Sequence, residues 1–600
     1  MQLSPGRAQR ANSGGGRVGL AQTAKKLGDV IRDSDAPTQA TPAERLAASR
    51  ATFYSLNALT RALDVTQGPG GAEAGIADPM MQVLTTQELR EAGEACVESL
   101  LALIGCKSLE LTKPFVSLIT QCFCQLFERC ESLNMVNAIL DMQAVAEAKK
   151  ATVGARIAAV TAQGALARTA GIRMVSLLPS TSAALGRQAK SSEPHVRVAA
   201  LLALRDLVDG ASAFGAPINP EVVRVCVRAC ADRCPEARAA AAAALAAVGS
   251  SGSGGLGGGG SGGRGGGGGL WASGISGTGL SPALEAVLAP IVKGLDDESP
   301  GVRLAMAEAT GAVLAAAVDG AAAERDRRGV IAARDQDQDD TAEATAARAV
   351  APQSQMDKLS ARFREMSQDM KVSVGKLSDK KLPAIAPTTL DNAILILSEL
   401  FRRATFPTLT SRDYMSGIAA AFVVLLRGAR HRITAATVPA VIRSVLELLD
   451  SDRLPQNGNE ACAVRTAVEY VLHDGVCARV PEGIQLAAAR ELIMVLSEVV
   501  GSSPPAAGFA PLLNEHQLQV CLVELSHLTH ALGQACAALK DSLVGCLCPL
   551  LGHASYGVRF EAAVGLTALG NALPFFAAGL LSRCLQDMAR HRETLLAPAP

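Results

Sequence analysis

The chain has 600 residues, and its 57 Lys and Arg balance 57 Asp and Glu, so the formal net charge is zero. That balance argues against a nucleic-acid binder, which usually carries a basic excess or a basic stripe. Apolar residues make up 49% of the chain but aromatic residues only 3%. This composition indicates a helical core of Ala, Leu and Val, and it argues against an all-β sandwich.

The first 85 residues, 1–85, are expected to form a mostly disordered N-terminal tail with a short helix. Residues 1–26 are basic but lack the apolar segment of a secretory signal; a transit peptide is the alternative interpretation. Residues 45–64 show helical spacing of apolar side chains. Fifteen scattered Cys without a secretory signal favour reduced thiols in the cytosol. We find no apolar run near the ~18 residues of a membrane-spanning helix.

Residues 86–249 are predicted to form helical repeats, because a motif begins to recur there. The motif is an Arg, often preceded by Val, then small residues and a Leu seven positions after the Arg. Arg197 with Leu204 and Arg238 with Leu245 are its first two copies. Pro194 and Pro235 precede these arginines by three residues, which suits the first turn of a helix, where the N–H that proline lacks is not needed. The arginine is therefore expected near the start of the second helix of each repeat.

Two low-complexity inserts are expected to interrupt the repeats. Residues 250–280 are predicted to be flexible, because Ser251–Gly269 holds 14 Gly in 19 residues and ordering them costs much entropy. A helical hairpin returns at 281–320. Residues 321–386 are then expected to be a charged, largely disordered insert with a possible helix. Within it, residues 321–355 are interpreted as disordered or as a loose charged helix, and residues 356–377 can form an amphipathic helix.

The hairpin at 281–320 carries the motif at Arg303, with Pro300 before it and Thr310 in the Leu position. Residues 387–600 are predicted to form the remaining helical repeats, with the motif at Arg465 and Arg559. Short Gly- and Pro-containing breaks separate the helical segments of this last region, as is typical of helix-hairpin repeats. The breaks fall at Pro407, 451–459, 501–511 and Pro574.

The motif places apolar side chains on one face of each helix. Val196 and Leu204 in the first copy, and Val558 and Leu566 in the last, are predicted to be buried between repeats. One helix pair cannot bury such a stripe alone, so neighbouring pairs must stack. The fold class is therefore all-α: an α-solenoid of HEAT-like helical-hairpin repeats with two low-complexity inserts.

The recurring arginines admit two interpretations. They could form a basic row that binds a partner, or each could be a structural residue that bonds a nearby carboxylate or carbonyl. We favour the structural interpretation, with Asp296 or Asp297 as the natural partner of Arg303.

No catalytic, cofactor-binding or metal-binding residue is predicted, and the chain is not expected to be an enzyme. The Gly tract lacks the preceding strand and the Lys-Ser/Thr ending of a phosphate loop. His527 and His530 lack the spacing of a His-Glu-x-x-His site. The clustered cysteines have no fourth ligand and are assigned to core packing. These cysteines are Cys122, Cys124, Cys226, Cys230, Cys234, Cys546 and Cys548.

Several segments resemble a known family. Residues 115–142 and 153–208, and later 389–405 and 555–576, are similar in order and spacing to the N-terminal region of the HEAT repeat-containing protein 5 family. The resemblance covers roughly residues 110–595 without the two inserts. Members of that family are much longer and accompany the clathrin adaptor complex AP-1.

The resemblance implies a non-enzymatic scaffold for AP-1- and clathrin-linked sorting and endosome-to-Golgi retrograde transport. The implied partners are AP-1-type adaptor subunits or their accessory proteins, with no nucleic acid, cofactor or small-molecule substrate. The implied location is the cytoplasm, with indirect, peripheral association at the trans-Golgi network, endosomes or clathrin-coated vesicles. The alternatives are a HEAT or armadillo-type scaffold for nuclear transport, a phosphatase or microtubules, and an enzyme whose catalytic domain lies beyond residue 600.

Overall fold

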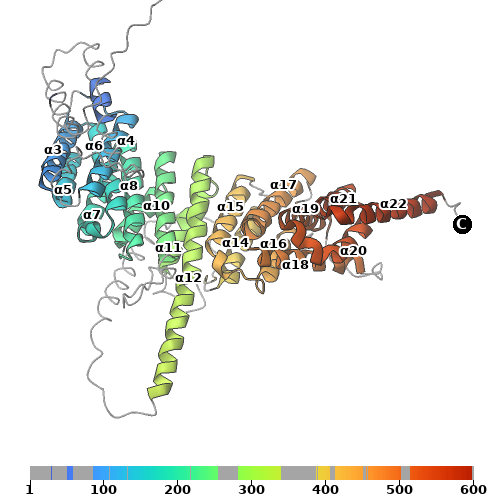
Figure 1. Cartoon of the computed structure of the whole chain (residues 1–600). Helices are drawn as coiled ribbons and strands as arrows, with labels where there is room; N and C mark the ends of the chain where they lie inside the picture. Colours follow the sequence, from blue (N-terminus) through green and yellow to red (C-terminus); the bar gives the residue numbers. More distant parts are fainter. Residues whose placement is uncertain are drawn as a thin grey trace, which may run out of the picture. The chain divides into compact units, whose positions relative to one another are not determined.

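The computed structural model (Figure 1) describes helices joined by short turns, and no strand occurs among its described residues. These are residues 29, 50–57, 86–106, 109–130, 133–216, 218–253, 282–338, 385, 387, 389–405, 412–450, 454–455, 457–501 and 514–596. Within the tail, residues 50–57 are helical, inside the predicted 45–64 segment. The predicted 356–377 helix and most of both inserts lie outside the described residues.

The chain divides into an N-terminal unit, Met1–Ala244, and a C-terminal unit, Leu245–Pro600. The N-terminal unit contains α3 (Thr86–Gly105), α4 (Lys113–Arg129), α5 (Met135–Glu147), α6 (Val153–Ala170), η1 (Gly171–Leu177), α7 (Leu178–Gln188), α8 (Pro194–Ala213) and α9 (Pro220–Ala229). The boundary falls inside α10 (Pro235–Ser253).

The C-terminal unit contains α11 (Pro282–Gly294), α12 (Pro300–Gln338), α14 (Leu390–Ala404), α15 (Arg412–Gly428), η4 (Arg430–Arg432), α16 (Val438–Leu446), η5 (Glu447–Leu449), α17 (Gly458–Tyr470), η7 (Val471–Cys477), α18 (Glu482–Gly501), α19 (Glu515–Leu532), η8 (Gly533–Leu539), α20 (Lys540–Leu550), α21 (Tyr556–Ala572) and α22 (Pro574–Leu596).

Within each unit the helices form two layers. In the N-terminal unit, α4, α6 and α8 pack in sequence in one layer, while α3, α5, α7 and α9 do so in the other. In the C-terminal unit, α12, α15, α17, α19 and α21 form one layer, and α14, α16, α18 and α20 form the other. Because each hairpin contributes one helix to each layer and packs on its neighbours, the fold is an all-α solenoid of HEAT-like helical hairpins.

The predicted helix starts and core positions are confirmed. Helices α8, α10 and α12 begin at prolines of the motif. Val196, Leu204 and Val558 are fully buried and Leu566 is 5% exposed. Thr310 is also buried; its hydroxyl donates to the Met306 carbonyl at 2.8 Å, so the polar substitute for Leu satisfies its hydrogen bond within the helix.

Close helix contacts depend on residues without a side chain. A Cβ added to Gly210 of α8 would lie 2.1 Å from the Ala167 carbonyl oxygen of α6. A Cβ on Gly311 of α12 would lie 2.5 Å from the Val424 Cβ of α15. Both contacts join second helices of neighbouring hairpins, and both are too short for any larger residue. Glycine at these two positions therefore sets how closely neighbouring helices of one layer pack.

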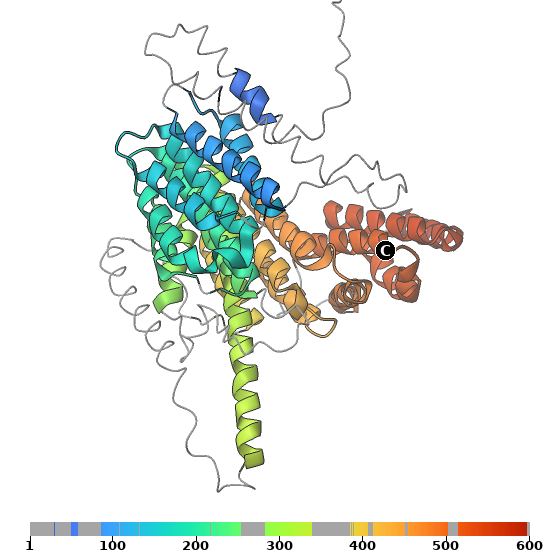
Figure 2. The ribbon, with the colours of Figure 1, turned by 60° about the vertical axis from the view of Figure 1, so that its left-hand side comes forward.

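Two helices continue into the predicted inserts. We expected the charged insert to begin at residue 321, but α12 runs from Pro300 to Gln338, and its second half extends past its neighbours in both views (Figures 1 and 2). Residues 321–338 combine several Ala with Glu, Arg and Gln, which are strong helix formers, and contain no Pro. Helix α10 likewise continues to Ser253, four residues into the predicted Gly-rich insert.

Contrary to the sequence expectation, two segments are long and apolar enough to cross a membrane by length and composition: Pro300–Ala323 and Glu515–Leu550. The apolar windows of these segments are 67% and 44% buried inside the structure. Helix α12 packs against α11 and α15, and α19 packs against α17, α18 and α21. A helix buried in a protein core is apolar because its side chains are removed from water, and a membrane-spanning helix is apolar for that reason too. Length and apolar composition are therefore weak evidence that these two segments span a membrane.

Candidate functional site

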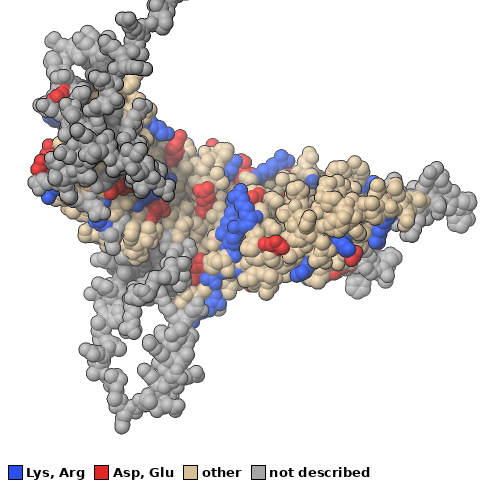
Figure 3. Space-filling view, viewed as in Figure 1, with Lys and Arg blue, Asp and Glu red and all other residues tan. Residues whose placement is uncertain are grey.

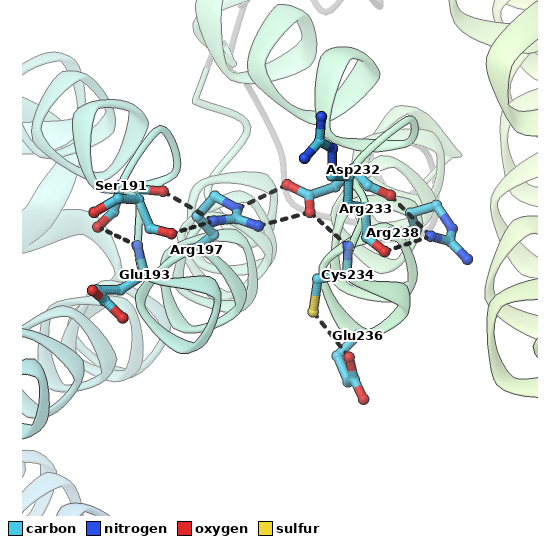
Figure 4. Close-up of polar contacts among 9 residues, drawn as sticks. Ser191, Glu193, Arg197, Asp232, Arg233, Cys234, Glu236 and Arg238 are labelled. Atoms are coloured by element: carbon cyan, nitrogen blue, oxygen red, sulfur yellow. Dashed lines mark hydrogen bonds and ion pairs between the residues drawn. The ribbon is translucent and has the colours of Figure 1, made fainter.

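The motif arginines make the same contact in four copies. In each copy, Nη1 donates to the backbone carbonyls six and five residues earlier, which lie in the turn between the two helices of the hairpin (Figure 4). The pairs are Arg197 with Ser191 and Ser192, Arg238 with Asp232 and Arg233, Arg303 with Asp297 and Glu298, and Arg559 with His553 and Ala554. These hydrogen bonds hold each turn against the start of the second helix.

The residue six positions before the arginine completes the turn. Its side chain accepts a hydrogen bond from the backbone N–H two residues later: Ser191 from Glu193, Asp232 from Cys234, Asp297 from Ser299 and His553 from Ser555. Thus the same residue accepts two hydrogen bonds: its side chain accepts from a backbone N–H of the turn, and its carbonyl accepts from the arginine. Because these turn carbonyls lie outside both helices, the arginine satisfies acceptors that would otherwise need water.

Some motif arginines also link one hairpin to the next. Arg197 of α8 forms a bidentate ion pair with Asp232, in the turn before α10, through two contacts of 2.8 Å (Figure 4). The hydrogen bond from Arg197 holds the pKa of the Asp232 carboxyl below its usual value. Arg303 of α12 pairs with Asp413 of α15 at 3.0 Å. Arg465 of α17 donates to Gln519 of α19.

The structural interpretation of the arginines is therefore confirmed, with a correction for Arg303. Asp297 serves it through its backbone carbonyl, whereas the carboxylate paired with Arg303 belongs to Asp413, beyond the second insert. Arg465 also departs from the pattern: its Nε lies 3.3 Å from Glu469 and its Nη2 3.3 Å from the Cys462 sulfur. Its hairpin turn is built differently, with Asn457 capping α17.

Basic and acidic side chains are interspersed on the visible face, with the largest group of Lys and Arg over α14 and α15 (Figure 3). Several arginines in this part of the chain have acidic partners. Arg402 and Arg403 both lie within 3.6 Å of Glu399, and Arg427 pairs with Asp474 at 2.8 Å. The described surface thus gives little support for a basic binding row.

The fifteen cysteines are free, and the clusters singled out in the sequence are mainly packing groups. Cys226 and Cys230 are buried in the α9 region, and burial raises the pKa of the Cys230 thiol to about 12. Cys234 is only partly buried, and its sulfur lies 2.9 Å from the Glu236 carboxylate instead of packing in the core. A buried thiol with a raised pKa, such as that of Cys230, is a poor nucleophile at neutral pH.

One polar cluster was missed by sequence reasoning. His473 of η7, and Glu524 and His527 of α19, place their ligand atoms within 4.8 Å of one another. The Nδ1 atoms of His473 and His527 lie 3.1 and 3.5 Å from Glu524 Oε2, and the two imidazole rings meet edge to face at 4.7 Å. Glu524 is 3% exposed, whereas both histidines are accessible.

The sequence held a partial signal for this cluster. Glu524 and His527 form a Glu-x-x-His pair on one helix face, a spacing that metal-binding helical bundles use. We considered His527 only together with His530, and His530 is not part of the cluster. The third member, His473, lies 51 residues before Glu524, so only the stacking of neighbouring hairpins brings it there.

The second helix of the last described hairpin exposes a line of apolar side chains. Tyr556, Phe560 and Val564 are 72%, 53% and 38% exposed at helical spacing on α21. The Tyr556 and Phe560 rings stack at 6.3 Å. On α22, Phe575, Leu581 and Leu585 are also exposed. Exposed apolar stripes of this kind are typical of surfaces that contact other proteins.

No protein-family model matches the chain. Among solved structures, an engineered protein matches with a TM-score of 0.32 at 12% identity, over 91% of this chain and 98% of its own. A structure of Kap95p with RanGDP matches with a TM-score of 0.41 at 12% identity, over 97% of this chain and 60% of the other. A Kap95:Nup1 complex gives a TM-score of 0.34 at 13% identity, over 94% and 71%. Similarities this weak carry no inference about function.

Proposed function

We propose that this protein is a non-enzymatic scaffold that assists AP-1- and clathrin-linked sorting and endosome-to-Golgi retrograde transport. The observation that carries the scaffold part is the repeated hairpin itself. Its recurring contact, an arginine bonded to two turn carbonyls, stabilises the hairpin turn in four copies. Such a solenoid offers an extended surface to protein partners.

The adaptor part of the proposal is supported by the ordered resemblance of residues 115–142, 153–208, 389–405 and 555–576 to the HEAT repeat-containing protein 5 family. Exposed apolar side chains on α21 and α22 supply surface suited to protein contacts. The partners would be AP-1-type adaptor subunits or accessory proteins. Recruitment to the trans-Golgi network, endosomes or clathrin-coated vesicles would then be peripheral and indirect, from the cytoplasm.

The proposal is tested by recovering the tagged full-length chain from its own cells and quantifying co-purified proteins. We expect enrichment of AP-1-type subunits, and we expect the tagged protein in puncta that overlap the adaptor. Depletion should mis-sort recycling cargo while bulk secretion continues. Enrichment of nuclear-transport, phosphatase or microtubule proteins without adaptor subunits would reject the trafficking role and favour a scaffold of that other system.

A further inference from the structure

Glu524 differs from the other buried acids in the described part of the chain. Three acidic residues are less than 7% exposed there: Asp319, Glu491 and Glu524. Asp319 pairs with Arg432 at 2.6 Å and Glu491 with Arg443 at 2.5 Å. The ion pairs of Glu524, in contrast, are both with histidines. The ion pairs of this buried carboxylate in the described residues thus include no Lys or Arg, unlike those of Asp319 and Glu491.

The surroundings of Glu524 are acidic. Glu469 of α17 and Glu561 of α21 interact electrostatically with His527, and burial raises the pKa of both carboxyls. Hydrogen bonding with Glu524 raises the pKa of His527. Cys477, at the end of η7, is buried, and burial together with the nearby Glu524 carboxylate raises the pKa of its thiol well above the usual value. Arg465 is the one Arg or Lys among the groups that act on Glu469 and Glu561, and Glu524 adds a third carboxyl to this cluster. A divalent cation bound here would therefore improve the local charge balance.

The geometry and the atom types fit one kind of cation. Two imidazole nitrogens and a carboxylate oxygen form a common zinc ligand set. Tetrahedral zinc, with ligand distances of about 2.0–2.2 Å, holds its ligand atoms about 3.3–3.6 Å apart; the two measured nitrogen–oxygen distances here are 3.1 and 3.5 Å. Magnesium and calcium prefer oxygen ligands and are poorly suited to this set.

The backbone around His473 is also unusual. His473 lies in η7, a π-helix that continues α17, and Arg479, two residues beyond η7, adopts φ 59°. Single-turn π-helices occur frequently at functional sites. Here the His473 side chain meets Glu524 of α19, and Glu524 and His527 project from adjacent turns of one helix face.

We propose that His473, Glu524 and His527 form a zinc-binding site that joins the second helices of two consecutive hairpins. The two Nδ1 atoms and the Glu524 carboxylate supply three ligands. Because both histidines are accessible, water can supply the fourth. Bound zinc would tie η7 to α19 and stabilise that part of the solenoid. The site does not depend on which protein partner the scaffold binds.

The test uses the full-length chain, first treated with a chelator and then titrated with Zn²⁺ by calorimetry at pH 7.5, with Mg²⁺ as the contrasting ion. We expect the wild type to bind zinc and not magnesium. His527→Asn should weaken zinc binding by roughly 100-fold or more, since losing even an outer-shell partner costs 10–100-fold. His527 is exposed, so this variant is expected to fold. His530→Asn, on the same helix outside the cluster, should bind as the wild type does.

Two further readouts separate a metal site from a simple His–Glu ion pair. Co²⁺ in place of Zn²⁺ should give the visible absorption of a tetrahedral site in the wild type and in His530→Asn, but not in His473→Asn. Zinc affinity should fall as the pH drops through the imidazole range, because each ligand must be deprotonated. Failure of the wild type to bind zinc, or equal zinc binding by wild type and His527→Asn, would overturn the proposal.

Discussion

At the scale of single residues, the motif arginine stabilises the hairpin turn by donating hydrogen bonds to its backbone carbonyls. Arg197 shows both of its roles, since it bonds the carbonyls of Ser191 and Ser192 and the carboxylate of Asp232. The Arg197 and Asp232 side chains are 18% and 15% exposed, so the pair is screened less than a surface salt bridge.

We expect Arg197→Met to cost more stability than Asp232→Asn, because the first change removes the carbonyl contacts as well as the ion pair. A hydrogen bond to a charged group contributes about 1.5–3 kcal/mol to stability when well shielded from water. Because Arg197 is partly exposed, we expect Arg197→Met to lower the free energy of unfolding by about 1–3 kcal/mol in total. Urea unfolding monitored by circular dichroism measures both. A larger loss for Asp232→Asn would show that the turn contacts contribute little.

The same pair predicts a pH dependence. The folded-state pKa of Asp232 is lowered, so its contribution is complete above the unfolded value of about 3.9 and is lost as the pH falls through the folded value. The stability difference between wild type and Asp232→Asn should therefore be constant above about pH 5 and shrink below about pH 4. A difference that persists unchanged at the lowest pH would contradict this assignment.

At the scale of elements, helix spacing is set by small residues at contacts. Gly311→Ala should destabilise the C-terminal unit by about 1–3 kcal/mol, because the added methyl group meets Val424 and backbone atoms of α15. Gly545→Ala in α20 is the matched control, since nothing lies within 4 Å of the added Cβ. It should stabilise its helix by about 0.5–1 kcal/mol. Thermal unfolding of both variants would reveal whether the two effects have opposite signs.

The apolar stripe gives a second prediction at this scale. Leu566→Ala in α21 should lower the free energy of unfolding by about 2–5 kcal/mol, because it removes a buried side chain and leaves a cavity that its neighbours cannot fully fill. Leu304→Ala in α12 changes a leucine that is 55% exposed and should cost much less. Denaturant melts compare the two. Equal losses would mean that the stripe does not determine packing in this solenoid.

At the scale of the whole molecule, stability is distributed over neighbouring hairpins. The C-terminal unit contains helices from both sides of the second low-complexity segment: α12 precedes the segment and packs against α14 and α15, which follow it. We expect trypsin to cut first within 339–386, at Arg348 or Lys358, because this composition is typical of chains that do not fold alone. The two fragments should co-elute in gel filtration, held by the α12–α15 contact. Separation of the fragments without denaturant would contradict that view of the unit.

The sequence by itself determined the helical class, the hairpin starts and the buried stripe, including Val196 and Leu566, because helical period and proline position are local properties. The sequence left open whether residues after 320 are disordered or a charged helix, and the structure shows that α12 continues to Gln338. Only the tertiary structure decided the partners of the side chains. Asp413 reaches Arg303 from beyond an insert, and His473 meets Glu524 and His527 from the preceding hairpin. Such contacts depend on how successive hairpins stack, and no local pattern in the chain encodes that register.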